Sequence, residues 1–272
     1  MKIYVVCDLE GVAGVIDFSQ QCQWDASKGY YAPYLDQARR LATLELNALV
    51  EGALEGGASE IIAWDGHGNF PGGLDVELLH PECRLVIGAG DGGPQGLDNS
   101  YAGLFLLGLH ARAGTPGGVL AHSFWGLVAG YYVNDMPVGE IWMNTYIAGL
   151  SGVPLVFLSG DRAAAQEAQA LVPGVETVVV KEGIAEGAEG LKVTPAISLA
   201  PQKARQLIKE AARRAMGKIS SLPPYRLEPP FNLRIEFTDP DLAERTAARP
   251  WAMRVNETTV AMNGVSEPWL LL

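Results

Sequence analysis

Short apolar runs and one long helical pattern alternate at the start of the chain, and together they predict a parallel α/β unit. Residues 2–7 are apolar and β-branched and end at a carboxylate, which is typical of a buried parallel strand. Across residues 34–55 the apolar positions recur at helical spacing, and Gly56 and Gly57 supply a stop. Residues 60–64 are predicted to form a second strand, which ends at Asp65. The order strand, helix, strand predicts a right-handed parallel crossover.

The same alternation continues through the middle of the chain. Further short strands are predicted at residues 84–87, 103–107, 118–121, 153–158 and 177–180. Helices are predicted at residues 138–150 and, with Asp161 as the N-cap, at residues 161–171. The predicted fold class is therefore α/β, with an open, mostly parallel sheet flanked by helices.

The last third of the chain has a different pattern. Residues 182–190 are rich in Glu and Gly and are predicted to form a solvated loop, and Pro223, Pro224, Pro229 and Pro230 indicate a linker. Helices are predicted at residues 201–216 and 239–247, and strands at residues 231–237, 251–255 and 258–262. We therefore predict an α/β domain at residues 1–190 and a smaller α+β lobe at residues 191–272.

Charge and composition exclude several classes of protein. The formal net charge of −11 and the absence of a Lys/Arg cluster argue against nucleic acid as a partner, because such binding needs a basic face. The apolar run at residues 3–7 is too short for a signal-peptide core or a membrane span. Three cysteines without C-x-x-C spacing indicate neither a disulfide framework nor a thiolate zinc site. We expect a cytoplasmic protein with reduced cysteines and no membrane partner.

Two carboxylates follow the first predicted strand. Asp8 and Glu10 are two residues apart, so along a strand they share one face with Cα atoms about 6.6 Å apart. Two carboxylates that converge on one point need a cation or a proton. The pair alone is equally compatible with solvation at a strand end.

Three of the four histidines also follow predicted strands. His67 lies between glycines in Asp65-Gly66-His67-Gly68, His110 follows the strand at 103–107, and His122 follows the strand at 118–121. The carboxyl ends of parallel strands share one edge, where ligand sites form, so we expect these rings to meet the carboxylates there. A single histidine would more often be a packed or hydrogen-bonded ring. His80 follows no predicted strand, and we assign it no role.

Two other features carry weaker signals. Glu140 lies in the first turn of the helix predicted at 138–150, where a carboxylate can serve the helix dipole alone. Residues 88–93 match the dinucleotide pattern G-x-G-x-x-G, but Pro94 and the polar residues after it do not begin a helix. We interpret this segment as a Gly-rich loop without a nucleotide.

Five short motifs occur in an order and spacing that are specific when taken together. They are Asp8-Leu9-Glu10-Gly11-Val12, Asp65-Gly66-His67-Gly68, Gly108-Leu109-His110-Ala111, Ala121-His122-Ser123, and Gly139-Glu140 followed by Asn144. Through these motifs the chain resembles, over essentially its whole length, the zinc D-aminopeptidases encoded with bacterial dipeptide transporters.

The resemblance implies a function and a set of site residues. It implies two Zn²⁺ ions per subunit with Asp8, Glu10, His67, His110 and Glu140 as ligands, all within the α/β domain at 1–190. It implies that His122 is the catalytic residue. The implied reaction is hydrolysis of short peptides with an N-terminal D-amino acid such as D-alanine, by a metal-activated water. The implied assembly is a ring-shaped homo-oligomer, with a decamer as the expectation.

The chemistry of peptide hydrolysis is consistent with this donor set. A metal polarises the amide carbonyl and lowers the pKa of bound water from 15.7 to about 7, and two metals about 3.5–4 Å apart need a bridging oxygen ligand. Asp8 is the candidate bridge, with Glu10 and His67 completing one ion and His110 and Glu140 the other. Mixed imidazole and carboxylate ligation suits Zn²⁺. His122 would remain free as a base, an acid or a stabiliser of the oxyanion.

Some positions depart from the resemblance. Leu109 stands where the family commonly has Tyr, Trp125 and Trp142 stand where smaller residues are more usual, and residues 182–195 match only loosely. These differences leave the implied ligands intact, but they make the substrate preference an open question.

Two alternatives come from other classes of protein. A magnesium phosphatase of the haloacid dehalogenase type shares an Asp after the first strand, but it needs Asp at the position of Glu10 and gives the three histidines no role. A non-catalytic, metal-stabilised oligomeric binding protein would use the same five ligands without a reaction. That alternative predicts that His122→Ala changes only local packing.

Overall fold

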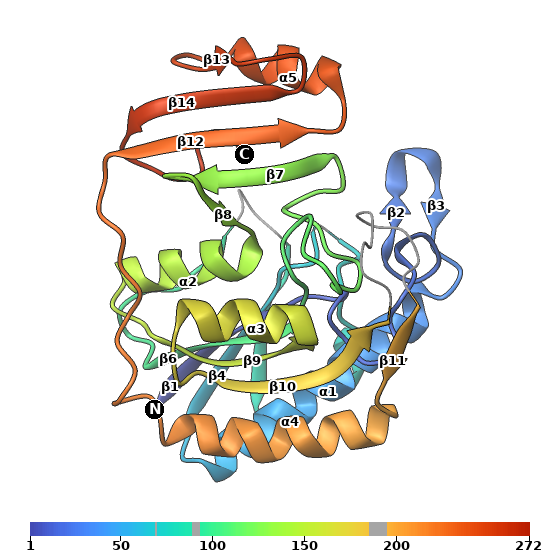
Figure 1. The fold of residues 1–272 in the computed structure, drawn as a ribbon. Coiled ribbons are helices and arrows are strands. Elements are labelled where there is room, and N and C mark those ends of the chain that lie inside the picture. Colours follow the sequence, from blue (N-terminus) through green and yellow to red (C-terminus); the bar gives the residue numbers. More distant parts are fainter. Residues whose placement is uncertain (69, 89–92, 185–194) are drawn as a thin grey trace.

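Buried strands build a parallel sheet at the centre of the molecule. The computed structural model describes residues 1–68, 70–88, 93–184 and 195–272. In the order β11-β10-β9-β6-β1-β4-β5, seven strands form the sheet, and all neighbours are parallel except β10 and β11 (Figure 1). The strands are β1 (Lys2–Cys7), β4 (Glu60–Asp65), β5 (Cys83–Val86), β6 (Gly103–Leu109), β9 (Leu155–Asp161), β10 (Glu176–Gly183) and β11 (Ala196–Ser198).

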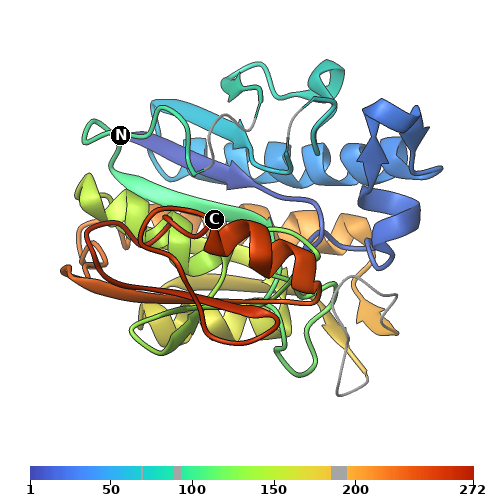
Figure 2. The ribbon, with the colours of Figure 1, turned by 90° about the horizontal axis from the view of Figure 1, so that it is seen from above.

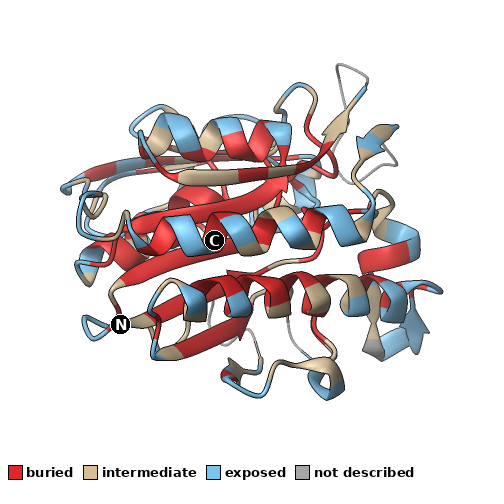
Figure 3. Cartoon of the chain, turned by 90° about the horizontal axis from the view of Figure 1, so that it is seen from below, coloured by how far each residue is buried: buried red, intermediate tan, exposed pale blue. Residues whose placement is uncertain are grey.

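Helices cover both faces of this sheet. On one face α1 (Leu35–Glu55) packs against α4 (Pro201–Met216), and on the other lie α2 (Glu140–Leu150) and α3 (Arg162–Leu171). Alternate residues of β1 point to these two layers, because Val5 belongs to the core under α1 while Val6 belongs to the core under α2 and α3. With both faces covered, the central strands β1, β4, β6 and β9 are almost wholly buried, which explains their continuous apolar runs (Figure 3).

A second sheet of five antiparallel strands packs beyond α2. Its order is β13-β14-β12-β7-β8, and α5 (Pro240–Ala247) lies against it. The strands are β7 (Val128–Val133), β8 (Met136–Val138), β12 (Phe231–Phe237), β13 (Met253–Arg254) and β14 (Thr259–Val265). Trp142 and Tyr146 of α2 belong to this second core, whereas Ile141 and Ala148 belong to the core of the parallel sheet. The helix α2 is therefore shared by both sheets, and seen from above the second sheet lies over it (Figure 2).

The fold class predicted from the sequence is confirmed, but several elements differ. The strand predicted at 118–121 is a loop, and β7 and β8 were not predicted. Residues 119–121 are fully buried, so their apolar run reflects packing and not a strand. The solvated loop predicted at 182–190 begins later, because β10 extends to Gly183, and residues 185–190 lie outside the described residues.

The predicted domain boundary at residue 190 does not separate the two sheets. The parallel sheet includes β11 and is covered by α4, both later than 190, while the second sheet includes β7 and β8, both earlier. The division into domains at 1–190 and 191–272 stays a prediction, and it is not the division between the sheets.

Other local predictions agree with the structure. Asp161 caps α3 by accepting a hydrogen bond from the Ala164 N–H at 2.8 Å. All three cysteines are free and buried. Two further strands, β2 (Trp24–Asp25) and β3 (Tyr30–Tyr31), form a separate two-stranded sheet near the π-helix η1 (Phe18–Cys22). Within the described ranges, every helix is too short or too polar to span a membrane.

Candidate metal centre

The carboxyl ends of three neighbouring strands bring the predicted donors to one edge. The register of the sheet places Cys7 of β1 opposite Asp65 of β4 and Leu107 of β6, so the segments after these strands begin side by side. Asp8 follows β1, His67 lies two residues after β4 and His110 follows β6 directly. This arrangement is the one expected of a parallel sheet.

Glycines allow the chain after β1 to run in close contact with the end of β6. The Gly11 N–H donates to the Gly108 carbonyl at 2.7 Å, and a Cβ on Gly11 would lie 2.1 Å from the Leu109 carbonyl oxygen. A Cβ on Gly108, whose φ is +70°, would lie 2.3 Å from the Asp8 carbonyl oxygen. Only glycine fits these two positions without displacing backbone, so they fix the approach of the Asp8 and His110 segments.

Asp8 lies in the middle of the cluster, with one carboxylate oxygen toward each of two histidines. Its Oδ1 is 3.0 Å from His67 Nδ1, and its Oδ2 is 3.4 Å from His110 Nε2. Glu10 Oε2 is 3.1 Å from His67 Nδ1, and Glu140 Oε1 is 3.7 Å from His110 Nε2. The five predicted ligands therefore gather in two halves that share Asp8.

Backbone carbonyls determine which nitrogen each histidine turns toward the carboxylates. His67 Nε2 is 3.1 Å from the Cys22 carbonyl oxygen, and His110 Nδ1 is 3.0 Å from the Ala111 carbonyl oxygen. A carbonyl only accepts, so each of these nitrogens carries the proton and donates. In their neutral form the rings would direct the lone pairs of His67 Nδ1 and His110 Nε2 at the cluster, as metal-ligating histidines do.

Several polar atoms of the cluster are buried without a hydrogen bond. Among the described side chains they include Glu10 Oε2, His110 Nε2 and Glu140 Oε2. Buried polar atoms of this kind are costly unless a partner satisfies them. Three carboxylates and two imidazoles with their free atoms converging fit a divalent cation, and this mixture of nitrogen and oxygen suits Zn²⁺. Asp8, Glu10 and His110, and separately His110, His122 and Glu140, offer ligand atoms within 4.8 Å of one another.

The carboxylates shift the pKa values of the rings between them. Burial opposes charge on His67, but Glu10 and Asp8 outweigh it and raise the pKa of His67 well above its ordinary value. Burial also opposes charge on His110, while Glu140 and Asp8 raise its pKa to about 10. Burial raises the pKa of Glu140 to about 7. The site favours positive charge at this point, which a proton or a metal cation can supply.

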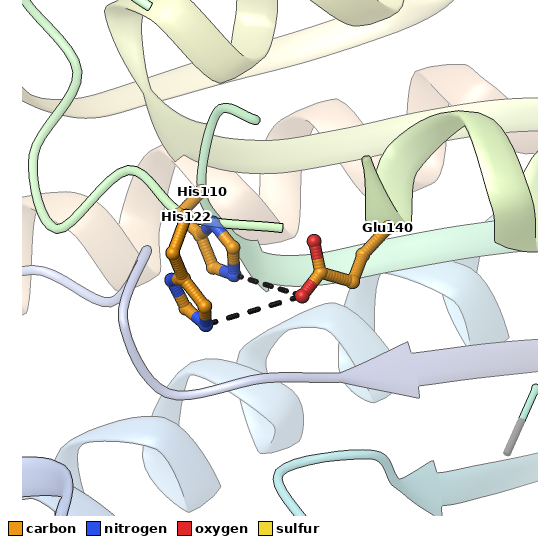
Figure 4. Close-up of side chains that lie close together, drawn as sticks. All are labelled: His110, His122 and Glu140. Atoms are coloured by element: carbon orange, nitrogen blue, oxygen red, sulfur yellow. Dashed lines mark ion pairs between the residues drawn. The ribbon is translucent and has the colours of Figure 1, made fainter. Parts of the chain in front are cut away.

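His122 reaches the same cluster from a loop and not from a strand end. Its ring stacks on His110 with centroids 3.9 Å apart, and its Nε2 is 3.9 Å from Glu140 Oε1 (Figure 4). Its Nδ1 is 2.9 Å from the Leu120 carbonyl oxygen and donates to it, so Nε2 carries the lone pair. Burial and the neighbouring charge of His110 lower the pKa of His122 to about 3. The prediction that His122 ends a strand is therefore wrong, although its nearness to the donors is as expected.

Strained backbone holds this loop. Leu120 and Phe124 have φ values of 57° and 66°, in the left-handed region that non-glycine residues rarely adopt. The Leu120 carbonyl accepts the His122 hydrogen bond, and the Phe124 N–H donates to Glu140 Oε1 at 2.7 Å. The two strained residues therefore orient His122 and Glu140, and strain of this kind persists where the surrounding structure enforces it.

Two supporting residues were not singled out from the sequence. Lys181 is buried and donates to the backbone carbonyls of Glu10, Val12 (3.0 Å) and Val15, so it holds the segment that carries Glu10. Asp65 accepts from the Gly73 N–H at 2.9 Å and fixes the loop after His67. A lysine that ends the apolar run 178–180 was the available signal for Lys181, since Lys is rarely buried without partners.

A large cavity opens beside the cluster. Its volume is about 1230 Å³, and its lining includes Asp8, Glu10, His67, His122 and Glu140. His110 does not line it and lies behind His122.

His80 is hydrogen-bonded to neighbouring backbone and does not line the cavity, so it stays without a role. Most of the Gly-rich segment 88–93 lies outside the described residues, which leave out 89–92.

Comparison with known proteins identifies the family of the chain. A D-aminopeptidase family model matches residues 1–267. A curated D-aminopeptidase of Bacillus subtilis (strain 168) is 36% identical over 267 residues, covering 96% of this chain and 90% of the relative. A solved structure, described as the Zn-dependent D-aminopeptidase DppA from Bacillus subtilis, a self-compartmentalizing protease, superposes with a TM-score of 0.82 at 33% identity, covering 100% of this chain and 93% of the other. The chain belongs to the D-aminopeptidase family of peptidases.

Proposed function

We propose that this peptidase binds two Zn²⁺ ions per subunit and hydrolyses short peptides that begin with a D-amino acid such as D-alanine. The observation that carries the proposal is the position of Asp8, whose Oδ1 lies near His67 Nδ1 and whose Oδ2 lies near His110 Nε2. Glu10 and His67 would hold one ion, His110 and Glu140 the other, and Asp8 would bridge them. The solved relative is described as Zn-dependent, which supports zinc as the metal.

The metal and the protein side chains would divide the chemistry. The ions would supply Lewis acidity toward the carbonyl and toward water. His122 faces the cavity with an unprotonated Nε2, while its Nδ1–H is fixed to the Leu120 carbonyl. We assign His122 the transfer of a proton from the attacking water to the departing amine. Its stacking on His110 holds the ring at the mouth of the cluster.

Burial of the cluster would also limit its contact with bulk water to the side that faces the cavity. Glu10 and His110 are 1% exposed, so the donors depend on one another and on the ions for their polar contacts. Such a site strengthens every electrostatic interaction with the substrate carbonyl.

Metal analysis combined with a stereochemical assay tests the function. We expect two zinc ions per chain, hydrolysis of D-Ala dipeptides, loss of that activity on chelation and its recovery with zinc. L-Ala dipeptides are the matched control. Turnover that survives complete removal of metal would rule out the proposed mechanism, and faster cleavage of the L series would remove the D-specific assignment alone.

We also propose that the chain assembles into a ring-shaped homo-oligomer, with ten subunits by resemblance. The solved relative, which this chain matches along its whole length, is described as self-compartmentalizing. Light scattering should then give a mass about ten times the 29.0 kDa of one chain. A particle of one chain would reject the assembly and leave the chemistry of the site untouched.

A further inference from the structure

The cavity beside the candidate metal centre is polar at one end and apolar elsewhere. All three side-chain carboxylates of its described lining, Asp8, Glu10 and Glu140, belong to the centre itself. The rest of the wall is mainly aromatic and aliphatic, and the described lining contains neither Lys nor Arg. A charged substrate side chain would lose its hydration there without gaining a partner of opposite charge.

The cavity is also large for a substrate with a methyl side chain. Its volume of about 1230 Å³ exceeds the range of about 300–1,000 Å³ typical of pockets for drug-sized ligands. Aromatic residues approach the centre from several segments of the chain. The Phe18 ring lies 6.3 Å from the His122 ring, and the Trp24 ring lies 5.2 Å from the His67 ring. A small side chain would leave much of this apolar surface in contact with water.

Trp125 is an aromatic residue of the cavity wall with surface left to contact a substrate. It is 37% exposed although it lines the cavity, so its ring still has apolar surface to bury. Its N–H donates to the Ser123 carbonyl at 2.8 Å, and its carbonyl accepts from the Val128 N–H at 3.0 Å. Its ring lies 6.5 Å from that of Phe237 in the second sheet. The backbone of Trp125 is therefore fixed, and Trp125 lies three residues after His122 in the chain.

We infer that the site selects peptides whose N-terminal side chain is large, apolar and uncharged, with Trp125 as a specificity-determining residue. This inference rests on the peptidase function proposed above. Burying a bulky apolar side chain in place of a methyl group should raise kcat/KM about 10- to 100-fold. The preference would apply to whichever enantiomer the centre accepts.

A series of amino-acid amides tests this inference on the zinc-loaded protein, because amides bring no aromatic leaving group of their own. We would measure ammonia release from the D and L amides of Phe, Leu, Ala, Lys and Glu. We expect Phe and Leu amides to exceed the Ala amide about 10- to 100-fold, and the Lys and Glu amides to be the slowest. Trp125→Ala should lower kcat/KM for the Phe amide about 10-fold and leave the Ala amide within about 3-fold.

Matched variants separate specificity from folding. Trp251→Ala removes a tryptophan that is 87% exposed and does not line the cavity, so kcat/KM should stay unchanged for both the Phe and the Ala amide. Trp125→Phe should fall between the wild type and Trp125→Ala for the Phe amide. Equal rates for Ala and Phe amides in the wild type would overturn the inference while the peptidase function stands. If the zinc-loaded protein cleaved neither the amides nor the D-Ala dipeptides, both the inference and the peptidase function would be overturned.

Discussion

The edge of the parallel sheet and the loop at 118–127 both supply histidines to one site, but they hold them in different ways. His67 and His110 follow strands whose hydrogen-bonded ladders are buried on both faces. His122 follows no strand and depends on two residues with positive φ, Leu120 and Phe124. The edge is rigid because many regular contacts determine it, whereas the loop stores backbone strain.

Because of this difference, we expect the edge to bind metal and the loop to serve catalysis and specificity. On the edge, carboxylates and imidazoles converge with buried atoms that lack hydrogen bonds, as a metal centre needs. On the loop, His122 faces the cavity, and Trp125 and Leu127 contribute to the cavity wall. We therefore expect substitutions on the edge to change metal content, and substitutions on the loop to change catalysis or specificity without changing metal content.

Asp8→Asn should have the largest effect, because the amide removes the charge shared by the two halves of the centre. We expect zinc per chain to fall below one and kcat/KM to fall by about 10⁴-fold or more, since the metal supplies several kcal/mol of stabilisation. Elemental analysis and the D-Ala dipeptide assay measure the two quantities. Full zinc content in Asp8→Asn would show that Asp8 is not the bridge.

His122→Ala should abolish most activity and spare the metal. A proton-transfer group contributes about 10²- to 10⁴-fold, and we expect kcat to fall by that factor with two zinc ions retained. The matched control is His80→Ala, in which zinc content and rate should stay at the wild-type values. If zinc content halves in His122→Ala, then His122 is a ligand and the difference between edge and loop disappears.

Lys181→Met tests the support beneath the edge. The substitution leaves three buried carbonyls, those of Glu10, Val12 and Val15, without the ammonium that bonds them. We expect the free energy of unfolding to fall by about 3–5 kcal/mol, because each buried acceptor left without its hydrogen bond costs about 1–3 kcal/mol. Urea denaturation measures it, with the exposed Lys203→Met as control. Equal stability of Lys181→Met and wild type would show that the lysine does not hold this segment.

Glu45→Gln should have the smallest effect, and it depends on pH. Burial raises the pKa of Glu45 to about 7 from its ordinary 4.5, against the hydrogen bond from the Ala13 N–H. The folded protein then binds one more proton than the unfolded chain between these values, so this contribution to stability is present below pH 4.5 and is lost as the pH rises to about 7. The loss over the whole range is on the order of 3 kcal/mol, at about 1.36 kcal/mol for each unit of pKa difference. Between pH 5 and pH 7.5, urea titrations should show a decrease that is larger in the wild type than in Glu45→Gln by most of this amount, and equal decreases in both would contradict the assignment.

Much of the edge could be predicted from the sequence, because the signal is local. Residues 2–7 and 60–64 are apolar runs that end in carboxylates, and parallel strands must end at a common edge. The loop could not be predicted in the same way. Residues 119–121 are apolar because they are buried, and periodicity cannot distinguish a buried loop from a buried strand in so short a run.

Long-range packing explains the remaining differences. The strand β7 pairs with β12, about a hundred residues later in the chain, and β8 joins the second sheet only through β7, so nothing local assigns this hairpin to that sheet. Glu140 was a weak candidate because a carboxylate at a helix start has a structural use of its own. Its position near His110 depends on α2 packing between the two sheets.

Anomalous diffraction at the zinc edge from crystals of the zinc-loaded protein tests the centre most directly. We expect two peaks on either side of the Asp8 carboxylate, one bonded to His67 Nδ1 and Glu10, the other to His110 Nε2 and Glu140. A single peak, or a peak bonded to His122 Nε2, would contradict the assignment of two ions to the edge and of the proton-transfer role to the loop.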